Sequence, residues 1–277
     1  MIPPLPFAPP AIADRDFRAL RDRIYQRAGI FFVPAKKALI VSRLQRRTRE
    51  LGLELKAYIQ LALSDAAEET RMLELLCTHE TSFFREAQHW ELLRRHVLPR
   101  WREEAEAGAR PRRVRVLSAG CSSGEEPYSA AMELATGLPG FAVEVVAGDV
   151  SPRIVERAAQ GEWPLERAKQ IPEPMLRRFM LRNTEGVMRA GPELRSLLRF
   201  TRLNLGQEAH PGLGVFDLIF CRNVLIYFDQ ASKARAIRSL LPHLDPRGLF
   251  FVGHAESLTG ISEELQTVIP TVYRRRG

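Results

Sequence analysis

The sequence predicts an α/β protein in which a doubly wound, mostly parallel sheet follows a small all-helical amino-terminal domain. Two observations support this prediction. Up to about Arg85, apolar residues recur every three or four positions, as in Leu39, Ile40 and Leu44, which is the spacing of amphipathic helices. Beyond about residue 110, short apolar runs alternate with helical stretches, which is typical of parallel strands joined by crossover helices.

The helical domain is assigned to residues 1–86. Pro34 and Gly52 interrupt its periodicity, so we expect about four short helices. A longer helix is expected from Arg85 to Gly108, with a kink or break at Pro99. The α/β domain is assigned to residues 87–277.

Four apolar runs predict the strands of that domain. They are "VRVLSAG", "AVEVVAGDV", "FDLIFCRNVLIYF" and "GLFFVGH". The proline-containing segment at about 163–200 breaks the alternation of strands and helices. We therefore expect an inserted small β-subdomain there, a hairpin with a helix.

The composition limits the class of protein and of partner. The chain has 277 residues and a net charge of +8, so nucleic acid, an anionic membrane or an acidic protein would each suit it. The three cysteines stand far apart, which disfavours a disulfide framework or a structural zinc site. The first ten residues lack the basic segment of a signal peptide, and no apolar run is long enough to span a membrane. A cytoplasmic protein is expected.

The stretch Gly120-Cys121-Ser122-Ser123-Gly124 has two interpretations. It matches the G-x-S-x-G nucleophile elbow of serine hydrolases, with Ser122 as nucleophile. It also resembles a glycine turn that holds a nucleotide-like cofactor. The turn follows the first strand, and no oxyanion-hole segment precedes it, although Asp149, Asp217 and His254 stand in the chain order of a hydrolase triad. We therefore favour the cofactor turn.

The acids near this turn indicate the kind of cofactor. Asp149 ends the next predicted strand, where a carboxylate accepts hydrogen bonds from ribose hydroxyls. Glu125 and Glu126 follow the turn directly and would repel a pyrophosphate. S-adenosylmethionine has no phosphate and carries sulfonium and ammonium charges. The pattern predicts a methyltransferase rather than a dehydrogenase.

Further site candidates follow other predicted strands. Arg222, Asn223 and Tyr227 follow an apolar strand, and Asn204-Leu205 follow another, where a contact to an adenine edge competes with a simple polar turn. The Asn/Asp-Pro-Pro-aromatic sequence of many amine methyltransferases is absent, which disfavours amine methylation.

The segment "CTHETSFFRE" stands just before the α/β domain. Arg85 could bind a carboxylate of cofactor or substrate. The competing interpretation is a helix boundary, with Thr81 as N-cap and Phe83 and Phe84 packing at the domain interface. His254 is interpreted as a structural histidine.

The segment Lys36–Arg49 carries six basic residues and no acid. On a helix, Lys36, Arg43 and Arg47 lie on one side. Such a stripe is either a solvated face or a docking surface for an anionic partner. No aromatic residues are interleaved, as a nucleic-acid surface would require.

Taken together, the motifs "TSFFRE", "AGCSSGEEPYSAAMEL", "GDVSPRIVERAAQGEW", "FDLIFCRNVLIYFD" and "GLFFVGHAESL" resemble those of the CheR-type chemotaxis receptor (protein-glutamate) methyltransferases. The resemblance covers nearly the whole chain. It implies a Rossmann-like S-adenosylmethionine-dependent methyltransferase domain that needs no metal. It also implies transfer of methyl groups to glutamates on cytoplasmic chemoreceptor helices, for adaptation in bacterial chemotaxis, with S-adenosylhomocysteine as product.

Matched residue by residue, the resemblance places the cofactor contacts on a defined set. These are Thr81, Arg85, Glu126, Asp149, Asn204, Leu205, Arg222 and Asn223. Tyr227 would line the methyl-transfer site beside Arg85, and Lys36–Arg49 would face the receptor. A monomer suffices for this reaction, and neither nucleic acid nor membrane insertion is implied.

Two positions depart from the family pattern. His79 stands where the family often has Asn, which puts a contact there in doubt. The segment "MLRNTEGVMRAGPEL" is shorter than in members that bind a tethering peptide at the receptor carboxyl terminus, so use of a tether stays open.

The residues fit the chemistry independently of the resemblance. A glutamate side chain, with an ordinary pKa of about 4.3, is already a carboxylate nucleophile at neutral pH and needs no strong base. Alignment for in-line displacement would then supply most of the catalysis. A methyltransferase for nucleic acid or another protein, and a sensor that binds the cofactor without turnover, are the alternatives.

Overall fold

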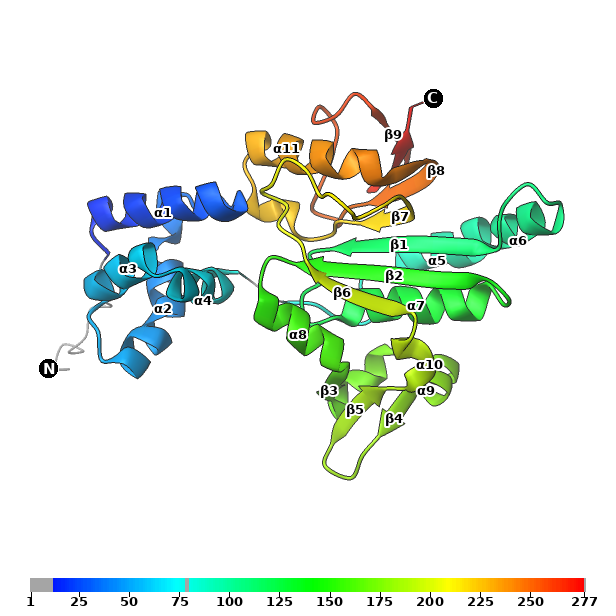
Figure 1. Ribbon diagram of the computed structural model, residues 1–277, viewed down its shortest axis with the longest axis horizontal. Helices are drawn as coiled ribbons and strands as arrows, with labels where there is room; N and C mark the ends of the chain where they lie inside the picture. The colour runs from blue at the N-terminus through cyan, green and yellow to red at the C-terminus, as the bar shows by residue number, and fades with distance from the viewer. Residues whose placement is uncertain (1–11, 78–79, 277) are drawn as a thin grey trace, which may run out of the picture. The chain divides into compact units, whose positions relative to one another are not determined.

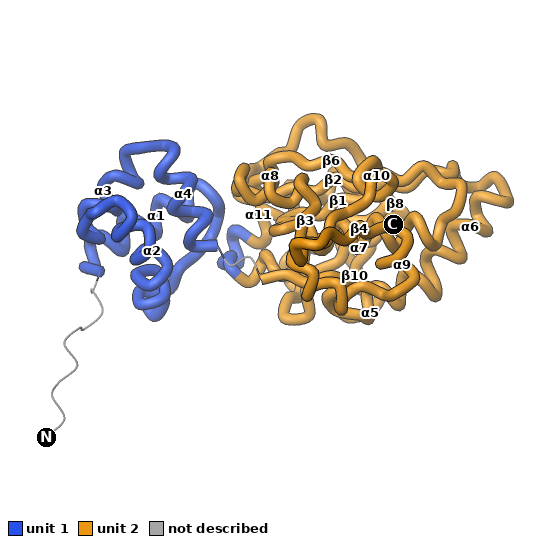
Figure 2. Tube along the Cα trace, turned by 90° about the horizontal axis from the view of Figure 1, so that it is seen from below, with its two compact units in different colours: residues 1–78, 227–232 blue, residues 79–226, 233–277 orange. Residues whose placement is uncertain are grey.

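The computed structural model describes residues 12–77 and 80–276. The amino-terminal segment 1–11 and His79 lie outside the described residues. The chain forms two compact units (Figure 2). The first contains residues up to 78 together with 227–232, and the second contains residues 79–226 and 233–277.

The division at residue 78 differs from the boundary at residue 86 that the sequence analysis places. The reason lies in the main chain of the segment that precedes residue 86. Phe83 N–H donates to Gln170 Oε1 at 3.1 Å, and Phe84 N–H donates to Ser129 Oγ at 3.0 Å. Both acceptors belong to the second unit, so this segment contacts the sheet domain.

Four α-helices build the first unit within its described residues, as the periodicity predicts. They are α1 (Asp14–Ala28), α2 (Lys37–Leu51), α3 (Leu55–Ser64) and α4 (Ala66–Leu76), with the 3-10 turn η1 (Pro34–Lys36) before α2. Gly29 and Gly52 end α1 and α2 with φ of 73° and 65°, the left-handed conformation that suits glycine at a helix end. Leu20, Ile24 and Leu44 are fully buried between these helices.

A short segment from far along the chain completes this unit. Phe228 forms an isolated antiparallel bridge with Ile30, and Phe31 N–H donates to the Tyr227 carbonyl at 2.8 Å. Tyr25 Oη donates to the Asp229 carboxylate at 3.2 Å. Tyr227 therefore belongs to the helical unit by its contacts.

The predicted helix from Arg85 to Gly108 is interrupted close to its proline. It consists of α5 (Ala87–Leu92), a π-helical turn η2 (Leu93–Val97) and α6 (Leu98–Glu106). Pro99 lies in the first turn of α6, where its missing N–H is tolerated and the preceding turn must widen. The irregularity expected at Pro99 is a π-helical turn just before it, and the helix continues through the proline without a gap.

The second unit contains a seven-stranded sheet of order β6-β2-β1-β7-β8-β10-β9 (Figure 1). The strands are β1 (Arg113–Ala119), β2 (Ala142–Asp149), β6 (Leu198–Arg202), β7 (Phe216–Phe220), β8 (Leu244–Phe251), β9 (Leu265–Ile269) and β10 (Val272–Arg275). Five strands pair in parallel, and β10 runs antiparallel to both β8 and β9. The strand order reverses between β1 and β7, which is the switch point of a doubly wound sheet.

Both faces of the sheet are covered, which explains the nearly continuous apolar runs of the strands. Val116 and Leu218 pack with Trp90 in one large core, where the α5–α6 segment and α7 (Glu125–Gly137) lie. Leu117 and Ile219 point to the opposite face and are equally buried. The helix α8 (Pro152–Gln160) contacts β2 and β6, and α11 (Gln230–Leu240) precedes β8.

The predicted insertion is a separate three-stranded antiparallel sheet of order β3-β5-β4 (Figure 1). It contains β3 (Glu162–Pro164), η3 (Leu165–Gln170), α9 (Glu173–Phe179), β4 (Met180–Arg182), β5 (Val187–Ala190) and α10 (Pro192–Arg195). Across the described ranges of both units, no helix combines the length and apolar character that a membrane span requires.

Candidate active site

The carboxyl end of β1 leads into the glycine turn. Gly120 and Gly124 have φ of 89° and 99°, values that suit only glycine. A Cβ on Gly120 would overlap Cγ2 of Val224, which lies in the loop after β7. Glycine at 120 thus brings two loops of the switch point into contact. Ser122 also has a positive φ of 49°, so the turn is strained at its centre.

Asp149, at the carboxyl end of β2, joins the turn to the next helix. Its Oδ2 accepts the Ser122 N–H at 3.1 Å and its Oδ1 accepts the Ser151 N–H at 3.2 Å. Ser151 in turn caps α8 by accepting the Ile154 N–H. The carboxylate is thereby fixed beside the turn, where a ribose-binding acid is expected.

Asn204 and Leu205 follow β6 next to Asp149. The Leu203 N–H donates to the Asp149 carbonyl at 3.0 Å, which carries the β2–β6 pairing up to this point. Asn204 Oδ1 accepts the Gly206 N–H at 2.9 Å, and Leu205 is buried. The structure therefore brings Asn204 and Leu205 to the same edge as Asp149 and the turn.

Arg222, which follows β7, is a buried guanidinium between two carboxylates. Its Nη2 donates to Glu86 Oε2 at 2.9 Å and its Nη1 donates to Glu126 Oε2 at 3.2 Å. Its Nη2 also donates to the Arg85 carbonyl. The side chain of Arg222 is 1% exposed, so it holds the surrounding segments together. The charge of Glu126 is partly offset by this contact, and the repulsion of anions attributed to Glu126 is weaker than the sequence suggests.

Asn223 has a left-handed conformation with φ of 58°, held by a second acid. Glu256 accepts the main-chain N–H groups of Asn223 at 2.8 Å, Gly253 at 2.6 Å and Ile226 at 3.1 Å. One buried carboxylate thus joins the loops after β7 and β8. The Asn223 side chain donates to Glu86 Oε1 at 3.2 Å.

The "TSFFRE" segment is bonded to this network through its main chain. Phe84 and Glu86 have φ of 51° and 61°, and the Arg85 carbonyl also accepts the Trp90 indole N–H at 2.9 Å. The Arg85 guanidinium donates to the Glu80 carbonyl at 3.0 Å. The Thr81 carbonyl accepts from Arg167 at 3.0 Å. These contacts order the segment and place its side chains beside the carboxyl ends of the strands.

Burial and charge move the pKa values of this network in opposite directions. Burial opposes ionisation of Glu86, but Arg222 and the donors of His254 and Asn223 overcome it and lower its pKa. Burial raises the pKa of Glu126 despite the pull of Arg222 and Ser118. Glu86 is also the nearer partner of Arg222, at 2.9 Å against 3.2 Å for Glu126.

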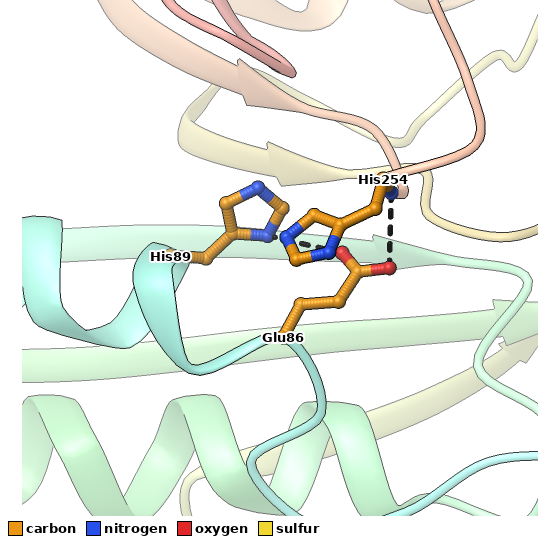
Figure 3. Close-up of side chains that lie close together, drawn as sticks. All are labelled: Glu86, His89 and His254. Atoms are coloured by element: carbon orange, nitrogen blue, oxygen red, sulfur yellow. Dashed lines mark hydrogen bonds and ion pairs between the residues drawn. The ribbon is translucent and has the colours of Figure 1, made fainter.

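Glu86, His89 and His254 lie close enough to suggest a cation site (Figure 3). The donors already around Glu86 oppose this interpretation. Its two oxygens accept from Arg222, from Asn223 and from the His254 N–H at 3.0 Å. A cation would have to displace these donors and sit beside a buried guanidinium, so we assign no metal here.

The structure therefore brings together part of the set of site residues that the sequence predicts. Glu126, Asp149, Asn204, Leu205, Arg222 and Asn223 line the carboxyl edge of the sheet, with Thr81 and Arg85 on the adjoining segment. Tyr227 belongs to the helical unit, so its place beside Arg85 stays a prediction. Glu86 and Glu256 were not predicted as site residues, although in "FFRE" and "GHAES" each stands close to a predicted helix boundary or strand end.

The polar groups at this edge of the sheet fit S-adenosylmethionine. Gly120 and Gly124 give the turn a main chain with positive φ and no side chain at these two positions, and Asp149 supplies a carboxylate of the kind that holds a ribose. The acidic first turn of α7, with Glu125 and Glu126, suits a cationic ligand better than a phosphate.

Known proteins resemble the chain over both units. The profile described as "CheR methyltransferase, SAM binding domain" matches residues 79–274, and "CheR methyltransferase, all-alpha domain" matches residues 15–77. Chemotaxis protein methyltransferase 2 of Pseudomonas aeruginosa is 38% identical over 93% of this chain and 92% of its own length. The chemotaxis protein methyltransferases of Salmonella typhimurium and Escherichia coli are 37% and 38% identical, each over 95% of this chain and 91% of their own lengths.

Proposed function

The chain belongs to the CheR methyltransferase family and is an S-adenosylmethionine-dependent methyltransferase of chemotaxis, and we propose that it forms γ-methyl esters on glutamates of cytoplasmic chemoreceptor helices. The observation that carries the proposal is the set of polar groups at the carboxyl edge of the sheet. Asp149 is fixed beside the glycine turn, where a carboxylate can hold the ribose of the cofactor. A carboxylate acceptor is already a nucleophile at neutral pH and needs no base from this edge.

The roles of the chain's own residues follow from their contacts. When bound, S-adenosylmethionine supplies an electrophilic methyl group on a sulfonium. Asp149 orients the ribose, and Arg222 holds the segments that carry Arg85 and Asn223. We assign the exposed part of Arg85 to orienting the acceptor carboxylate, and Tyr227 to the methyl-transfer site. Orientation of the reacting groups supplies the catalysis.

The helix α2 is proposed as the receptor-facing element, but the residues assigned to docking differ from the stripe of Lys36, Arg43 and Arg47 that the sequence predicts. Arg47 pairs with Glu68 at 2.7 Å and with Glu50 at 3.3 Å, and Arg43 donates to the Leu76 carbonyl. These two arginines therefore stabilise the helical unit. Lys36, Arg46 and Arg49 are exposed, and we assign receptor docking to them; Arg46 also pairs at the surface with Glu50, at 2.9 Å.

The proposal is tested with methyl-tritiated S-adenosylmethionine, the purified protein and membranes containing chemoreceptors of the same cell. Protein-bound label that mild alkali releases as volatile methanol is the expected result, because carboxyl methyl esters hydrolyse readily. Label that resists alkali means N-methylation and contradicts the ester assignment.

Two variants separate cofactor binding from transfer. Asp149→Asn should weaken S-adenosylmethionine binding by about tenfold, because it removes a charged acceptor. Tyr227→Phe should leave the cofactor Kd within about twofold and lower kcat by about 10²-fold. Equal loss of binding in both variants contradicts the assigned roles.

A further inference from the structure

A groove lies on the second unit at the opposite end of the sheet from the glycine turn. Its walls are the segment of η2 and α6 on one side and β8, β10 and β9 on the other, and its volume is about 600 Å³. Arg110, which precedes β1, and Arg247, near the start of β8, contribute to it. We call it the arginine groove, defined by Arg100, Arg110, Arg247, Arg274 and Arg275.

Strand alternation explains how arginines come to lie beneath a helix. On β8, Arg247 and Leu249 share the face that carries the buried Phe251 further along. On β10, Arg274 shares the face of the buried Val272, and it pairs with Gln266 of β9. The sheet face that forms the core near the middle of the strands thus becomes cationic at their ends.

Two of these arginines have no acidic partner within the part of the chain that the structure describes. Arg247 and Arg274 are exposed and form no ion pair there, whereas Arg100 pairs with Glu104 at 2.7 Å and Arg275 lies 3.7 Å from Glu264. Adjacent unpaired cations repel one another, and an anionic ligand relieves that repulsion. Glu104 is the single acid that lines the groove among the described residues.

Arg110 supplies a second, independent observation. Its side chain is 5% exposed, pairs with Asp217 and stacks over Trp101 with its Cζ 4.1 Å from the ring centroid. Its buried Nε has no hydrogen-bond partner among the described residues. A buried donor left unpaired is costly, so Asp217 alone does not satisfy the Arg110 guanidinium.

The lining also indicates which anion fits. Leu92, Val97, Leu249 and Val268 give the groove aliphatic surface, and Val268 is 43% exposed. The Trp101 ring is buried beneath Arg110, and the imidazole of His96 is the other aromatic ring that lines the groove among the described residues, so the groove offers a nucleobase only a small stacking surface. Guanidinium groups pair well with carboxylates, and aliphatic walls suit leucine-like side chains.

We propose that the arginine groove binds an acidic peptide segment of a partner protein, one in which carboxylates alternate with aliphatic side chains. Arg247 and Arg274 pair with the carboxylates, and the aliphatic residues pack on Val97 and Val268. This docking site is separate from the methyl-transfer site and from the receptor-facing α2, and it does not depend on the ester assignment.

The probe is a fluorescein-labelled peptide of eight residues in which glutamate alternates with leucine. Its anisotropy is titrated with the full chain at about 0.1 M salt. Arg247→Glu with Arg274→Glu should weaken binding by at least about tenfold, as expected for two lost charge-assisted bonds. The control Arg102→Glu changes an exposed residue of α6 outside the groove and should change affinity by less than about twofold.

Three outcomes overturn the proposal. They are no binding to the unaltered protein, unchanged binding to the double variant, and equal binding of a serine-for-leucine peptide that millimolar inorganic phosphate displaces. The last outcome makes the groove a general anion site. Methyl transfer should persist in every variant, so a negative result here is distinguishable from failure of the proposed function.

Discussion

At the scale of single residues, Arg222 is the centre of the candidate active site. Its single positive charge lies between the carboxylates of Glu86 and Glu126, and its Nη2 donates to the Arg85 carbonyl. Removing one member of a buried ionic network leaves uncompensated charge, which typically costs about 3–5 kcal/mol. The site is therefore coupled to the stability of the second unit.

Arg222→Met is predicted to lower the free energy of unfolding by about 3–5 kcal/mol, measured by urea denaturation. Adding Glu86→Gln should restore part of this loss, because it removes the carboxylate with the lowered pKa. The matched control is Arg94→Met. Arg94 pairs with the buried Glu133 at 2.9 Å but is itself 48% exposed, so its loss should cost less. Equal losses in the two single variants contradict the central role of Arg222.

His89 makes the stability of this network depend on pH. Burial, together with the charge of Arg222, lowers the pKa of His89 to about 4, although Glu86 opposes the shift; His254 is the other titratable group beside it. An unfolded histidine has a pKa of about 6.5 and binds its proton first as pH falls. The stability contributed by neutral His89 is therefore complete above about pH 6.5 and is lost between about pH 6.5 and 4.

The predicted loss is about 3 kcal/mol across that window, since each unit of pKa corresponds to about 1.4 kcal/mol. The His89 Nε2 lies 2.8 Å from Thr271 Oγ1, a hydrogen bond that glutamine can also form. His89→Gln should flatten the unfolding free energy between pH 6.5 and 4. His254→Gln, at an exposed site, should keep the slope. His210, whose pKa burial also lowers, leaves a residual slope in both variants. If the His89→Gln variant keeps the same slope of unfolding free energy against pH, the pH dependence does not come from His89.

At the scale of elements, the glycine turn after β1 depends on two separate requirements. Residue 120 has a positive φ, and it must lack a Cβ because that atom would overlap the Val224 side chain. Gly140 shares the first requirement, with φ of 78°, but a Cβ there would lie 3.8 Å from its nearest neighbour, an ordinary contact. The two glycines form a matched pair.

Gly140→Ala should cost about 1–2 kcal/mol, the cost of the left-handed conformation. Gly120→Ala should cost a further 1–3 kcal/mol, roughly, for overpacking, and should also weaken S-adenosylmethionine binding. Thermal unfolding and calorimetric titration of both variants measure these effects. If the Gly140 variant loses as much cofactor affinity as the Gly120 variant, the turn is not the cofactor turn.

The elements that were predicted are those with a local signal. The four helices, the parallel strands and the insertion each follow from periodicity or from proline and glycine. The roles of Glu86 and Glu256 were missed because they arise from contacts across 136 and 33 residues of sequence. No local pattern separates a buried acid of this kind from a solvated one. For the same reason, the pairing of Arg47 with Glu68 was not foreseen from the basic stripe.

At the scale of the whole molecule, receptor binding and cofactor binding should differ in how strongly they depend on salt. The net charge of +8 and the exposed cations of α2 favour attraction to an acidic receptor surface. The cofactor edge is built from buried groups such as Arg222 and Glu126, which salt screens much less. Raising salt from about 0.1 M to about 1 M shortens the screening length from about 10 Å to about 3 Å.

The KM for receptor membranes is therefore predicted to rise by about tenfold over this range, while the Kd for S-adenosylmethionine stays within about twofold. The variant Lys36→Glu with Arg49→Glu should already have a raised KM at low salt and a smaller further response. Arg247→Glu with Arg274→Glu, which changes net charge equally, should keep the full response, because its charges line a different surface. Equal salt responses in the two double variants would mean that net charge alone attracts the receptor, and the assignment of docking to α2 would fail.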